Sequence, residues 1–264
     1  MHTDVTLIGF GEAASTFSRA ARWAGRARSF DILPARARAM ADLGVQHDDC
    51  VERAVSEADL VLSLVTADQA LVAAQAAAPH LPANAIWCDM NSVAPETKRS
   101  AADAIQAAGG RYVDVAVLAP VEPARLTVPM LLSGADADET KSRLAALGFT
   151  NIRVVGTEIG RASAIKMIRS VMVKGVEALT DEMMAAARAA KVEDEVLASL
   201  DASEKAQPWP VRAAYNIERM TTHGARRAAE MEESARTLLA LGVQPVMTQG
   251  TIKRQRDAAG KTPA

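Results

Sequence analysis

The segment Gly9-Phe10-Gly11-Glu12-Ala13-Ala14 constrains the fold of this chain more than any other, because it joins an apolar run to a helical pattern with the spacing G-x-G-x-x-A. In such a turn the first glycine permits a sharp change of direction, the second lets the backbone approach a pyrophosphate, and the alanine allows close helix–strand packing. The N-terminus of the helix stabilises phosphate charge. We therefore expect Gly9, Phe10, Gly11, Glu12 and Ala13 to bind a dinucleotide; the alternative is that these glycines only form a tight turn.

Strand and helix patterns alternate from residue 5 to residue 155, which is typical of a doubly wound, mainly parallel sheet. The sequence predicts an α/β Rossmann domain over residues 1–157. Strands are expected at residues 5–8, 28–33, 60–65, 85–90, 112–118, 129–132 and 152–155, and helices at residues 12–24, 35–43, 67–78, 95–108 and 136–147.

The pattern changes after Gly160, where apolar residues recur at helical spacing from Arg161 to about Ala190. A helix of that length is roughly 45 Å long, and we expect it to span a domain or dimer interface. Further helices are predicted at residues 193–203, 209–220 and 225–241, followed by a polar tail at 253–264 that we expect to fray. Residues 158–264 are thus predicted to be an all-α domain with a long interdomain helix, completed by a second subunit in a homodimer.

Composition argues against several classes of protein. A net charge of −2 and 3% aromatic residues do not favour nucleic acid or an anionic membrane as a partner. No run approaches about 18 apolar residues, so no membrane span is predicted. The N-terminus lacks the pattern of a signal peptide, and two cysteines without a CxxC motif favour a reducing compartment, so we expect a cytoplasmic protein. The four histidines are isolated from one another, and no metal site is predicted.

Asp31 ends the second predicted strand, 22 positions after Gly9. An acidic side chain at that position can accept hydrogen bonds from both ribose hydroxyls and repels a 2′-phosphate, which favours NAD. Arg36 and Arg38 follow closely and could instead meet the 2′-phosphate of NADP. The sequence therefore predicts NAD or NADP as the cofactor, with Asp31 favouring NAD.

Two loops that follow predicted strands resemble the β-hydroxyacid dehydrogenase superfamily, whose relatives include 6-phosphogluconate dehydrogenase and the imine reductases. One is Val65-Thr66-Ala67-Asp68, and the other is Asp89-Met90-Asn91-Ser92-Val93-Ala94-Pro95, which is similar to the family's D-x-S-T-x-x-P. The resemblance implies that Val65 and Thr66 pass the cofactor, and that Asn91 and Ser92 bind substrate beside the nicotinamide, with Asn91 also near the cofactor. A helix N-cap ahead of Pro95 is the alternative.

The segment Gly156-Thr157-Glu158-Ile159-Gly160-Arg161-Ala162-Ser163-Ala164-Ile165-Lys166 is similar to the family's G-x-x-G-x-G-x-x-x-K, which opens the long interdomain helix. The resemblance implies that Lys166 is the general acid/base at the carbon that undergoes hydride transfer. A lysine desolvated in a cleft has a lowered pKa and can accept or return the proton of an alcohol. A surface lysine is the alternative.

The chain departs from the family after this lysine. Ser170 stands where the family often has asparagine, with Arg169 before it, and Lys174 lies eight positions after Lys166 on the same helix face. Such a polar stripe suits an anionic substrate, a carboxylate in particular. Pairing of Arg169 and Lys174 with acids on neighbouring helices is equally compatible with the sequence.

A second departure is Asp114-Val115-Ala116-Val117-Leu118-Ala119-Pro120, where the family's acid reductases carry D-A-P-V-S-G-G. Those glycines offer N–H groups to a substrate carboxylate, whereas Pro120 has none. We expect Val117 and Leu118 to line the substrate site, and the altered run argues against 3-hydroxyisobutyrate or glyoxylate chemistry. His223 follows Thr221-Thr222 at an expected helix start, where we expect it to bind substrate or to assist proton transfer; a hydrogen-bonded structural histidine is the alternative.

The chain resembles a subgroup of this family that has a 6-phosphogluconate-dehydrogenase-type NAD-binding domain and a short helical C-terminal domain. The segments that carry this resemblance are Val117 through Pro120, Arg169-Ser170, Lys174-Gly175 and His223-Gly224-Ala225-Arg226-Arg227. The resemblance implies an NAD(P)-dependent oxidoreductase acting on the hydroxyl, or the corresponding carbonyl, of a small anionic hydroxy acid. Imine reduction or oxidative decarboxylation in the same fold is one alternative. A nucleotide-sensing regulatory protein without turnover is another, which Lys166 disfavours.

Overall fold

The computed structural model describes residues 5–203 and 206–261. The chain forms two compact units, Met1–Arg169 and Ser170–Ala264. They meet inside the long helix α7 (Arg161–Ala190), whereas the sequence placed a domain boundary between residues 157 and 158. The structural division falls later because the first turns of α7 are anchored to the sheet of the first unit, through backbone N–H groups of Ala162 and Ser163.

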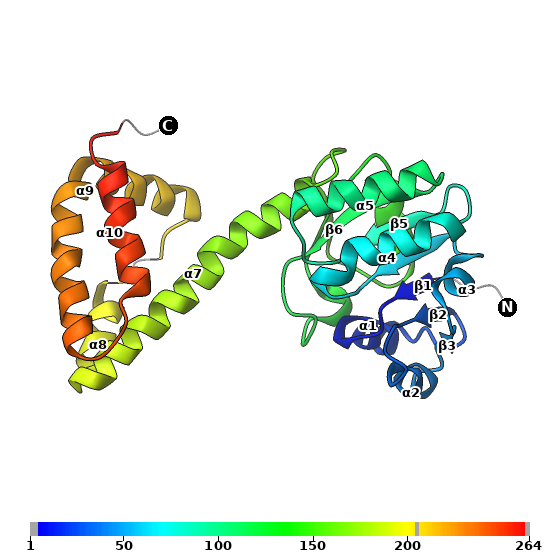
Figure 1. Cartoon of the computed structure of the whole chain (residues 1–264), viewed down its shortest axis with the longest axis horizontal. Helices are drawn as coiled ribbons and strands as arrows, with labels where there is room; N and C mark the ends of the chain where they lie inside the picture. Colours follow the sequence, from blue (N-terminus) through cyan, green and yellow to red (C-terminus); the bar gives the residue numbers. More distant parts are fainter. Residues whose placement is uncertain (1–4, 204–205, 262–264) are drawn as a thin grey trace. The chain divides into compact units, whose positions relative to one another are not determined.

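The first unit is built on one eight-stranded sheet with the strand order β3-β2-β1-β4-β5-β6-β7-β8 (Figure 1). Strands β1 to β6 are parallel, β7 is antiparallel to β6, and β8 is parallel to β7. This topology confirms the predicted doubly wound, mainly parallel sheet. The strands are β1 (Val5–Ile8), β2 (Ala27–Phe30), β3 (Gln46–His47), β4 (Leu60–Ser63), β5 (Ile86–Asp89), β6 (Arg111–Val117), β7 (Met130–Ser133) and β8 (Ile152–Val154).

Six α-helices and three short 3₁₀ turns connect these strands. Strand β3 and helix α3 were not predicted, because two and five residues are too short to produce a recognisable periodicity. The helices are α1 (Glu12–Ala21), α2 (Arg36–Asp42), α3 (Val51–Val55), α4 (Ala70–Ala77), α5 (Pro95–Ala107) and α6 (Ala137–Ala146), and the turns are η1 (Ala67–Gln69), η2 (Ala78–His80) and η3 (Arg125–Thr127).

Alternating side chains of the strands form two large hydrophobic cores, one on each face of the sheet, and a small third cluster contains Ala116, Leu131 and Ala162. Leu7 of β1 belongs to the core that contains residues of α1, α2 and α6, while its neighbour Ile8 belongs to the core that contains residues of α3, α4 and α5. Figure 1 shows α4 and α5 lying beside each other over the same face. Both faces are therefore covered, which explains why the central strands have uninterrupted apolar sequences.

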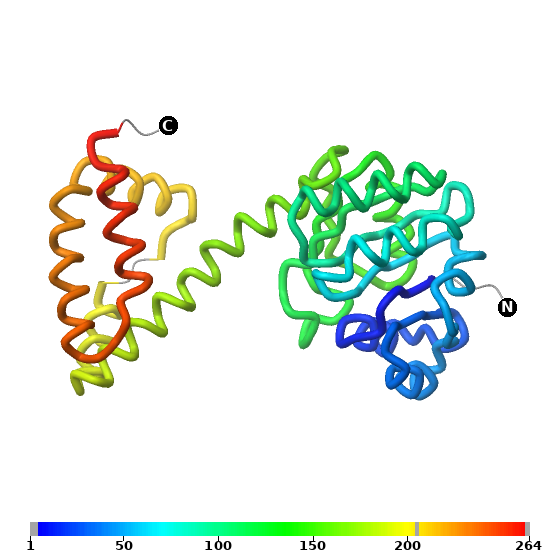
Figure 2. Tube along the Cα trace, in the orientation of Figure 1, coloured from blue at the N-terminus to red at the C-terminus, as the bar shows by residue number. Residues whose placement is uncertain are grey.

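The second unit consists of helices, as predicted for the C-terminal region. It contains the later turns of α7, together with α8 (Glu193–Ser203), α9 (Trp209–Ala240) and α10 (Val246–Ala258). Figure 2 shows α9 and α10 running side by side in opposite directions. Glu182 of α7 caps α10, because its carboxylate accepts the backbone N–H groups of Met247 and Thr248 at 2.6 and 2.9 Å.

The prediction of two helices at residues 209–220 and 225–241 was wrong, since α9 is continuous through Thr221, Thr222, His223 and Gly224. Gly224 is buried against α10, and a Cβ at this position would lie 2.2 Å from the carbonyl oxygen of Gln255. This glycine therefore permits close packing of two helices rather than ending one.

The prediction that residues 253–264 fray was also wrong for the first half of the segment, because α10 extends to Ala258. Ile252 and Gln255 are buried beneath α9, which holds these turns in place although their sequence is polar. Residues 262–264 lie outside the described residues. Among the helices that the structure describes, none combines the length and the apolar character needed to cross a bilayer.

Candidate functional site

The candidate site lies at the carboxyl ends of β1, β4 and β5. Strands β1 and β4 are parallel neighbours, while the chain leaves β1 for β2 on the other side. Adjacent strands whose connections leave in opposite directions open a crevice at their carboxyl ends, where α/β sheets bind ligands. The loops that carry Gly9, Thr66 and Asn91 all begin at these ends.

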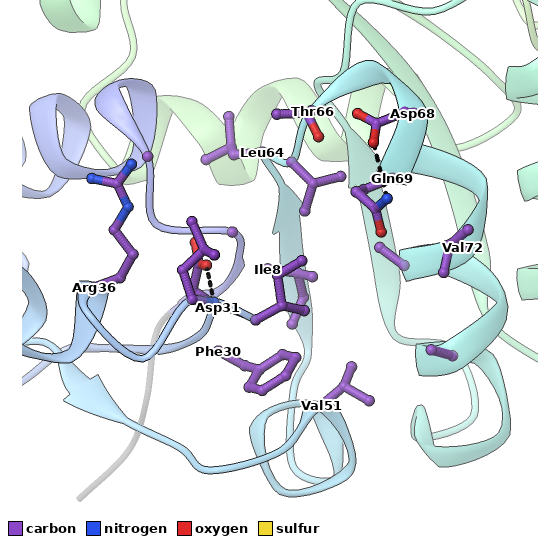
Figure 3. A pocket seen from close by; sticks show the side chains of 17 residues that line it. Ile8, Phe30, Asp31, Arg36, Val51, Leu64, Thr66, Asp68, Gln69 and Val72 are labelled. Atoms are coloured by element: carbon purple, nitrogen blue, oxygen red, sulfur yellow. Dashed lines mark hydrogen bonds between the residues drawn. The ribbon is translucent and has the colours of Figure 1, made fainter.

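The first of two hollows at this edge, which we call the Asp31 hollow, has a volume of about 340 Å³. Figure 3 shows Asp31 and Arg36 on one side of it and Thr66, Asp68 and Gln69 on the other. Of the described residues up to 160, the large apolar side chains that are mostly exposed are Ile32, Leu33 and Val72, and all three line this hollow.

The glycine turn fits a pyrophosphate. Gly9 has φ +90°, and a Cβ there would lie 2.7 Å from the carbonyl oxygen of Leu64, so only glycine is accommodated. A Cβ on Gly11 would meet no atom within 4 Å, which leaves open space beside the backbone at the start of α1. No side chain caps α1 at Gly11, so its first N–H groups are available to an anion.

Asp31 is held by the backbone in an orientation that fits a ribose. Its Oδ2 accepts the N–H of Phe10 at 2.6 Å, and its Oδ1 accepts the N–H of Leu33 at 2.8 Å. Each carboxylate oxygen retains a further lone pair for a hydroxyl. Hydrogen bonds from Gln69 and Thr66 hold the pKa of Asp68 below its usual value, so this second carboxylate stays charged. The hollow therefore offers two acidic side chains and one basic side chain, Arg36.

The second hollow, which we call the Lys166 hollow, has a volume of about 360 Å³. It shares Leu64 and Val65 with the Asp31 hollow, so one elongated ligand can occupy both by crossing the end of β4. This pair of adjoining hollows suits a molecule with two parts joined by a pyrophosphate at the glycine turn. The predicted site residues that line the Lys166 hollow are Glu12, Ala13, Val65, Asn91, Ser92, Val117 and Lys166.

Lys166 lies in the second turn of α7 and is partly buried. Its Nζ donates a hydrogen bond to Oγ of Ser92 at 2.5 Å, which brings together two residues that are 74 positions apart in the sequence. An amine and a hydroxyl at this distance can exchange a proton with the same oxygen atom of a bound molecule.

Asn91 supplies the other polar group of this hollow and is buried. Its Nδ2 donates to Oγ of Ser63 at 2.9 Å, while its Oδ1 has no hydrogen-bond partner. A buried acceptor without a partner is costly, and a donor on a bound ligand would satisfy it. The structure thus adds Ser63 to the site, as the residue that orients Asn91.

A buried polar network behind the Lys166 hollow was missed at the sequence level. It contains Lys98 of α5, Asp89 of β5 and Asp114 of β6. One signal was available: Lys98 precedes the buried residues Ala101, Ala102 and Ile105 at intervals of three, four and seven, so it shares their helix face. A lysine on the buried face of a helix requires anionic partners.

The other predicted site residues occupy different environments. The ring of Phe10 belongs to a hydrophobic core, and its contribution to the site is its N–H. Leu118 packs against Ala116, Leu131 and Ala162, and its carbonyl oxygen accepts Nη1 of Arg169 at 3.3 Å. Ser170, Lys174 and His223 belong to the second unit.

His223 does not stand at a helix start, because α9 continues through it. It lines a hollow of about 290 Å³ on α9 together with Tyr215, Glu218, Arg219, Thr222 and Arg226. Among residues 5–203 and 206–261, no three His, Cys, Asp or Glu side chains gather as a metal site would require.

Comparison with protein families identifies both parts of the chain. Residues 4–160 match the NAD binding domain of 6-phosphogluconate dehydrogenase. Residues 187–258 match a domain of unknown function, DUF1932.

Two solved structures are similar to this chain over most of its length. A conserved hypothetical protein from Sinorhizobium meliloti 1021 is 40% identical, with 97% of this chain and 88% of that chain covered and a TM-score of 0.65. A conserved protein of unknown function, described as structurally similar to 3-hydroxyacid dehydrogenases, is 33% identical, with 96% of each chain covered and a TM-score of 0.63.

More distant structures share the fold. An imine reductase from Myxococcus stipitatus, solved as a variant with NAD+, is 19% identical, with 98% of this chain and 93% of that chain covered and a TM-score of 0.78. The same enzyme with NADP+ is 20% identical, with 96% of this chain and 93% of that chain covered and a TM-score of 0.78.

Proposed function

The chain belongs to the family with the NAD-binding domain of 6-phosphogluconate dehydrogenase, and on that premise we propose that it oxidises a hydroxyl of a small anionic hydroxy acid, or reduces the corresponding carbonyl. The single observation that carries this proposal is the hydrogen bond between Lys166 and Ser92, which lies in a hollow that adjoins the Asp31 hollow. A nucleotide-sensing protein has no need of an amine at that position.

Several residues would hold NAD(P). The glycine turn and the start of α1 suit the pyrophosphate, Asp31 suits a ribose, and Ile32, Leu33 and Val72 suit an apolar ring. The bound nicotinamide would accept or supply the hydride. Two carboxylates against one guanidinium favour NAD over NADP, because a 2′-phosphate would add negative charge beside Asp31 and Asp68.

The chemistry of the chain's own residues is proton transfer. In the oxidation, neutral Lys166 takes the hydroxyl proton as the carbonyl forms, and in the reduction protonated Lys166 returns it. Ser92 donates to or accepts from the same substrate oxygen, and Asn91 Oδ1 accepts a hydrogen bond from the bound molecule. Arg169, Ser170, Lys174 and His223 stay predictions for binding of the anionic group, each to be tested by its effect on KM.

The main test is replacement of Lys166 by alanine. We expect Lys166→Ala to lower kcat by roughly 10²–10⁴-fold, leaving a small residual turnover, and to leave the dissociation constant of the dinucleotide almost unchanged, because the amine acts only on the substrate proton. A panel of hydroxy acids and sugar acids with NAD and NADP, followed by absorbance of the reduced cofactor, first identifies the substrate. Cyclic imines in the same panel test the alternative reaction. Turnover by Lys166→Ala at a similar rate would remove the lysine from the mechanism.

Cofactor preference is tested separately. Asp31→Ala should weaken NAD binding, and Arg36→Ala should weaken NADP binding while sparing NAD, since only a 2′-phosphate would use the guanidinium. Titration of intrinsic tryptophan fluorescence measures both. If Asp31→Ala bound NAD as tightly as the unchanged protein, Asp31 would not be the ribose ligand.

We also propose that a second copy of the chain covers the apolar surface of the helical unit. Val171 and Val176 on α7 and Trp209 on α9 are each more than half exposed. Large apolar side chains that are this exposed are candidates for burial against a partner. Sedimentation equilibrium should give a homodimer, and Val171→Asp should shift it toward the monomer; a monomeric unchanged protein would exclude this partner.

A further inference from the structure

Lys98 forms the centre of a charge network that is fully buried beneath the Lys166 hollow. Its Nζ donates to Oδ1 of Asp89 at 2.9 Å and to the carbonyl oxygen of Asp89 at 2.6 Å, and it lies 3.3 Å from Oδ1 of Asp114. The three side chains are at most 1% exposed. One ammonium group thus joins α5 to the carboxyl end of β5 and to β6.

On one side this network reaches the first turn of α7. Oδ2 of Asp114 accepts the N–H of Ser163 at 2.9 Å, and Oγ of Ser133 accepts the N–H of Ala162 at 3.0 Å. Ser133 also donates to Asp114 at 3.3 Å. The first N–H groups of a helix have no partner within the helix, so these two side chains of the sheet fix where α7 begins. Lys166 follows Ser163 by less than one turn.

On the other side the network reaches the loop that carries Ser92. Oδ1 of Asp89 accepts the N–H of Asn91 at 2.9 Å, and Oδ2 accepts the hydroxyl of Tyr112 at 2.7 Å. Burial, reinforced by the charge of Asp89, raises the pKa of Tyr112, so the phenol keeps its proton and remains the donor. The backbone that leads to Ser92 is therefore tied to the same lysine as the start of α7.

We propose that Lys98, Asp114 and Ser133 are positioning residues, which hold the start of α7 and the loop after β5 so that Lys166 and Ser92 act on one substrate oxygen. The inference rests on the proposed function. A buried ion pair contributes little net stability compared with apolar residues of the same volume, so a reason other than stability is needed for its presence. Directional bonds to both segments provide that reason, because a displacement of about 1 Å at reacting groups can lower a rate by about a hundredfold.

The least disruptive test is Ser133→Ala, with Ser29→Ala as the matched control. Both serines are fully buried in strands of the same sheet, but Ser29 donates to the carbonyl oxygen of Leu7, on the far side from α7. We expect Ser133→Ala to lower kcat by about tenfold with KM for the dinucleotide unchanged. The amide protons of Ala162 and Ser163 should exchange faster in Ser133→Ala, and Ser29→Ala should show neither effect.

Two further variants separate positioning from general loosening. Asp114→Asn keeps an oxygen that can accept the N–H of Ser163 and removes the negative charge that faces Lys98, so kcat should fall. If kcat equalled that of the unchanged enzyme, Lys98 would have no part in the positioning. In a Lys166→Ala background, Ser133→Ala should cause no further loss of residual turnover, because its effect is exerted through the lysine. A full tenfold loss in that background would overturn the proposal.

The exchange measurement distinguishes failure of this inference from failure of the proposed function, since it needs neither substrate nor cofactor. Faster exchange at Ala162 and Ser163 with kcat unchanged would overturn positioning and leave the dehydrogenase proposal intact. If the unchanged protein turned over no substrate of the panel, the proposed function would be rejected. If the amide protons of Ala162 and Ser163 exchanged equally fast in Ser133→Ala and in the unchanged protein, the holding role of Ser133 would be rejected independently.

Discussion

The two compact units differ in how their interiors are filled. The first unit buries its largest side chains completely, among them Trp23, Trp87, Phe17 and Phe149, on the two faces of one sheet. In the described part of the second unit, the core cluster consists of Ala228, Ala235 and Ile252 with Met231 packed against them. The first unit therefore has a sufficient core of its own, whereas the second buries mostly small side chains.

The two units also differ in where their large apolar side chains are exposed. In residues 5–160 the exposed large apolar side chains are confined to the Asp31 hollow, where a ligand would cover them. In the second unit they extend along helices, as at Val171, Val176, Leu200 and Ile217. We infer that the first unit is specialised to bind a small molecule and the second to bind protein surface, consistent with the dimer proposed above. If the interiors differ in this way, changes to buried groups should alter the stability of the two units by different amounts.

The largest effect is expected in the first unit, from Lys98→Met. Removal of the ammonium leaves the carboxylates of Asp89 and Asp114 buried without a cation, which should destabilise the unit by about 3–5 kcal/mol. Urea unfolding followed by near-ultraviolet circular dichroism measures this, because Trp23 and Trp87 are buried in the first unit. Lys141→Met, at an exposed lysine of α6, is the control and should change stability by less than about 0.5 kcal/mol. Equal losses in the two variants would contradict a paired role for Lys98.

A smaller effect is expected in the second unit, from Gly224→Ala. The new Cβ would lie 2.2 Å from the carbonyl oxygen of Gln255, so α9 and α10 must separate, at a cost of about 2–3 kcal/mol. Gly250→Ala on α10 is the matched control, since its Cβ meets nothing within 4 Å and should stabilise the helix by about 0.5–1 kcal/mol. Thermal unfolding by far-ultraviolet circular dichroism measures both. Dinucleotide affinity should be unchanged in either variant, and a parallel loss of affinity would show that the units are not independent.

The contrast between the units also explains what the sequence could predict. In the first unit the glycine turn and the apolar runs are local signals, and they indicated the parallel sheet and the position of Asp31 at the end of the second strand, while Lys166 was indicated by the resemblance of residues 156–166 to a family motif. Contacts between distant segments were not predictable in this way. Ser63 orients Asn91 across 28 positions, and Asp114 holds Ser163 across 49, and no local pattern reports such pairs.

In the second unit the same local rules misled. Thr221, Thr222 and Gly224 have the composition of a helix boundary, yet α9 continues through them because the glycine faces α10. The polar segment after Ile252 has the composition of a frayed tail, yet it is helical where it packs on α9. Packing between helices overrides local propensity, and the partner of Gly224 lies 31 positions later at Gln255.

The smallest effect is expected at Glu182, whose buried carboxylate caps α10 in the second unit. Burial by itself would raise the pKa of Glu182, but hydrogen bonds from Thr248 and from backbone N–H groups at Met247 and Thr248 outweigh it, so the pKa lies below its ordinary value of 4.5. A carboxyl group whose pKa is lower in the folded state stabilises the fold above its unfolded pKa, and this contribution is lost as the pH falls through the folded value.

The helical unit should therefore lose stability as the pH falls below 4.5, and Glu182→Gln should remove that part of the dependence. At neutral pH we expect Glu182→Gln to cost about 1–2 kcal/mol, because its amide nitrogen cannot accept the N–H that one carboxylate oxygen accepts now. Glu177→Gln, at an exposed position of the same helix, is the control and should retain the dependence. Thermal unfolding followed by far-ultraviolet circular dichroism at about pH 3 to 7, a range that brackets the ordinary pKa of a carboxyl group, measures this pH dependence. If both variants gave parallel curves, the carboxylate of Glu182 would not be ionised in the folded unit, and its cap on α10 would not be a charged one like the network of the first unit.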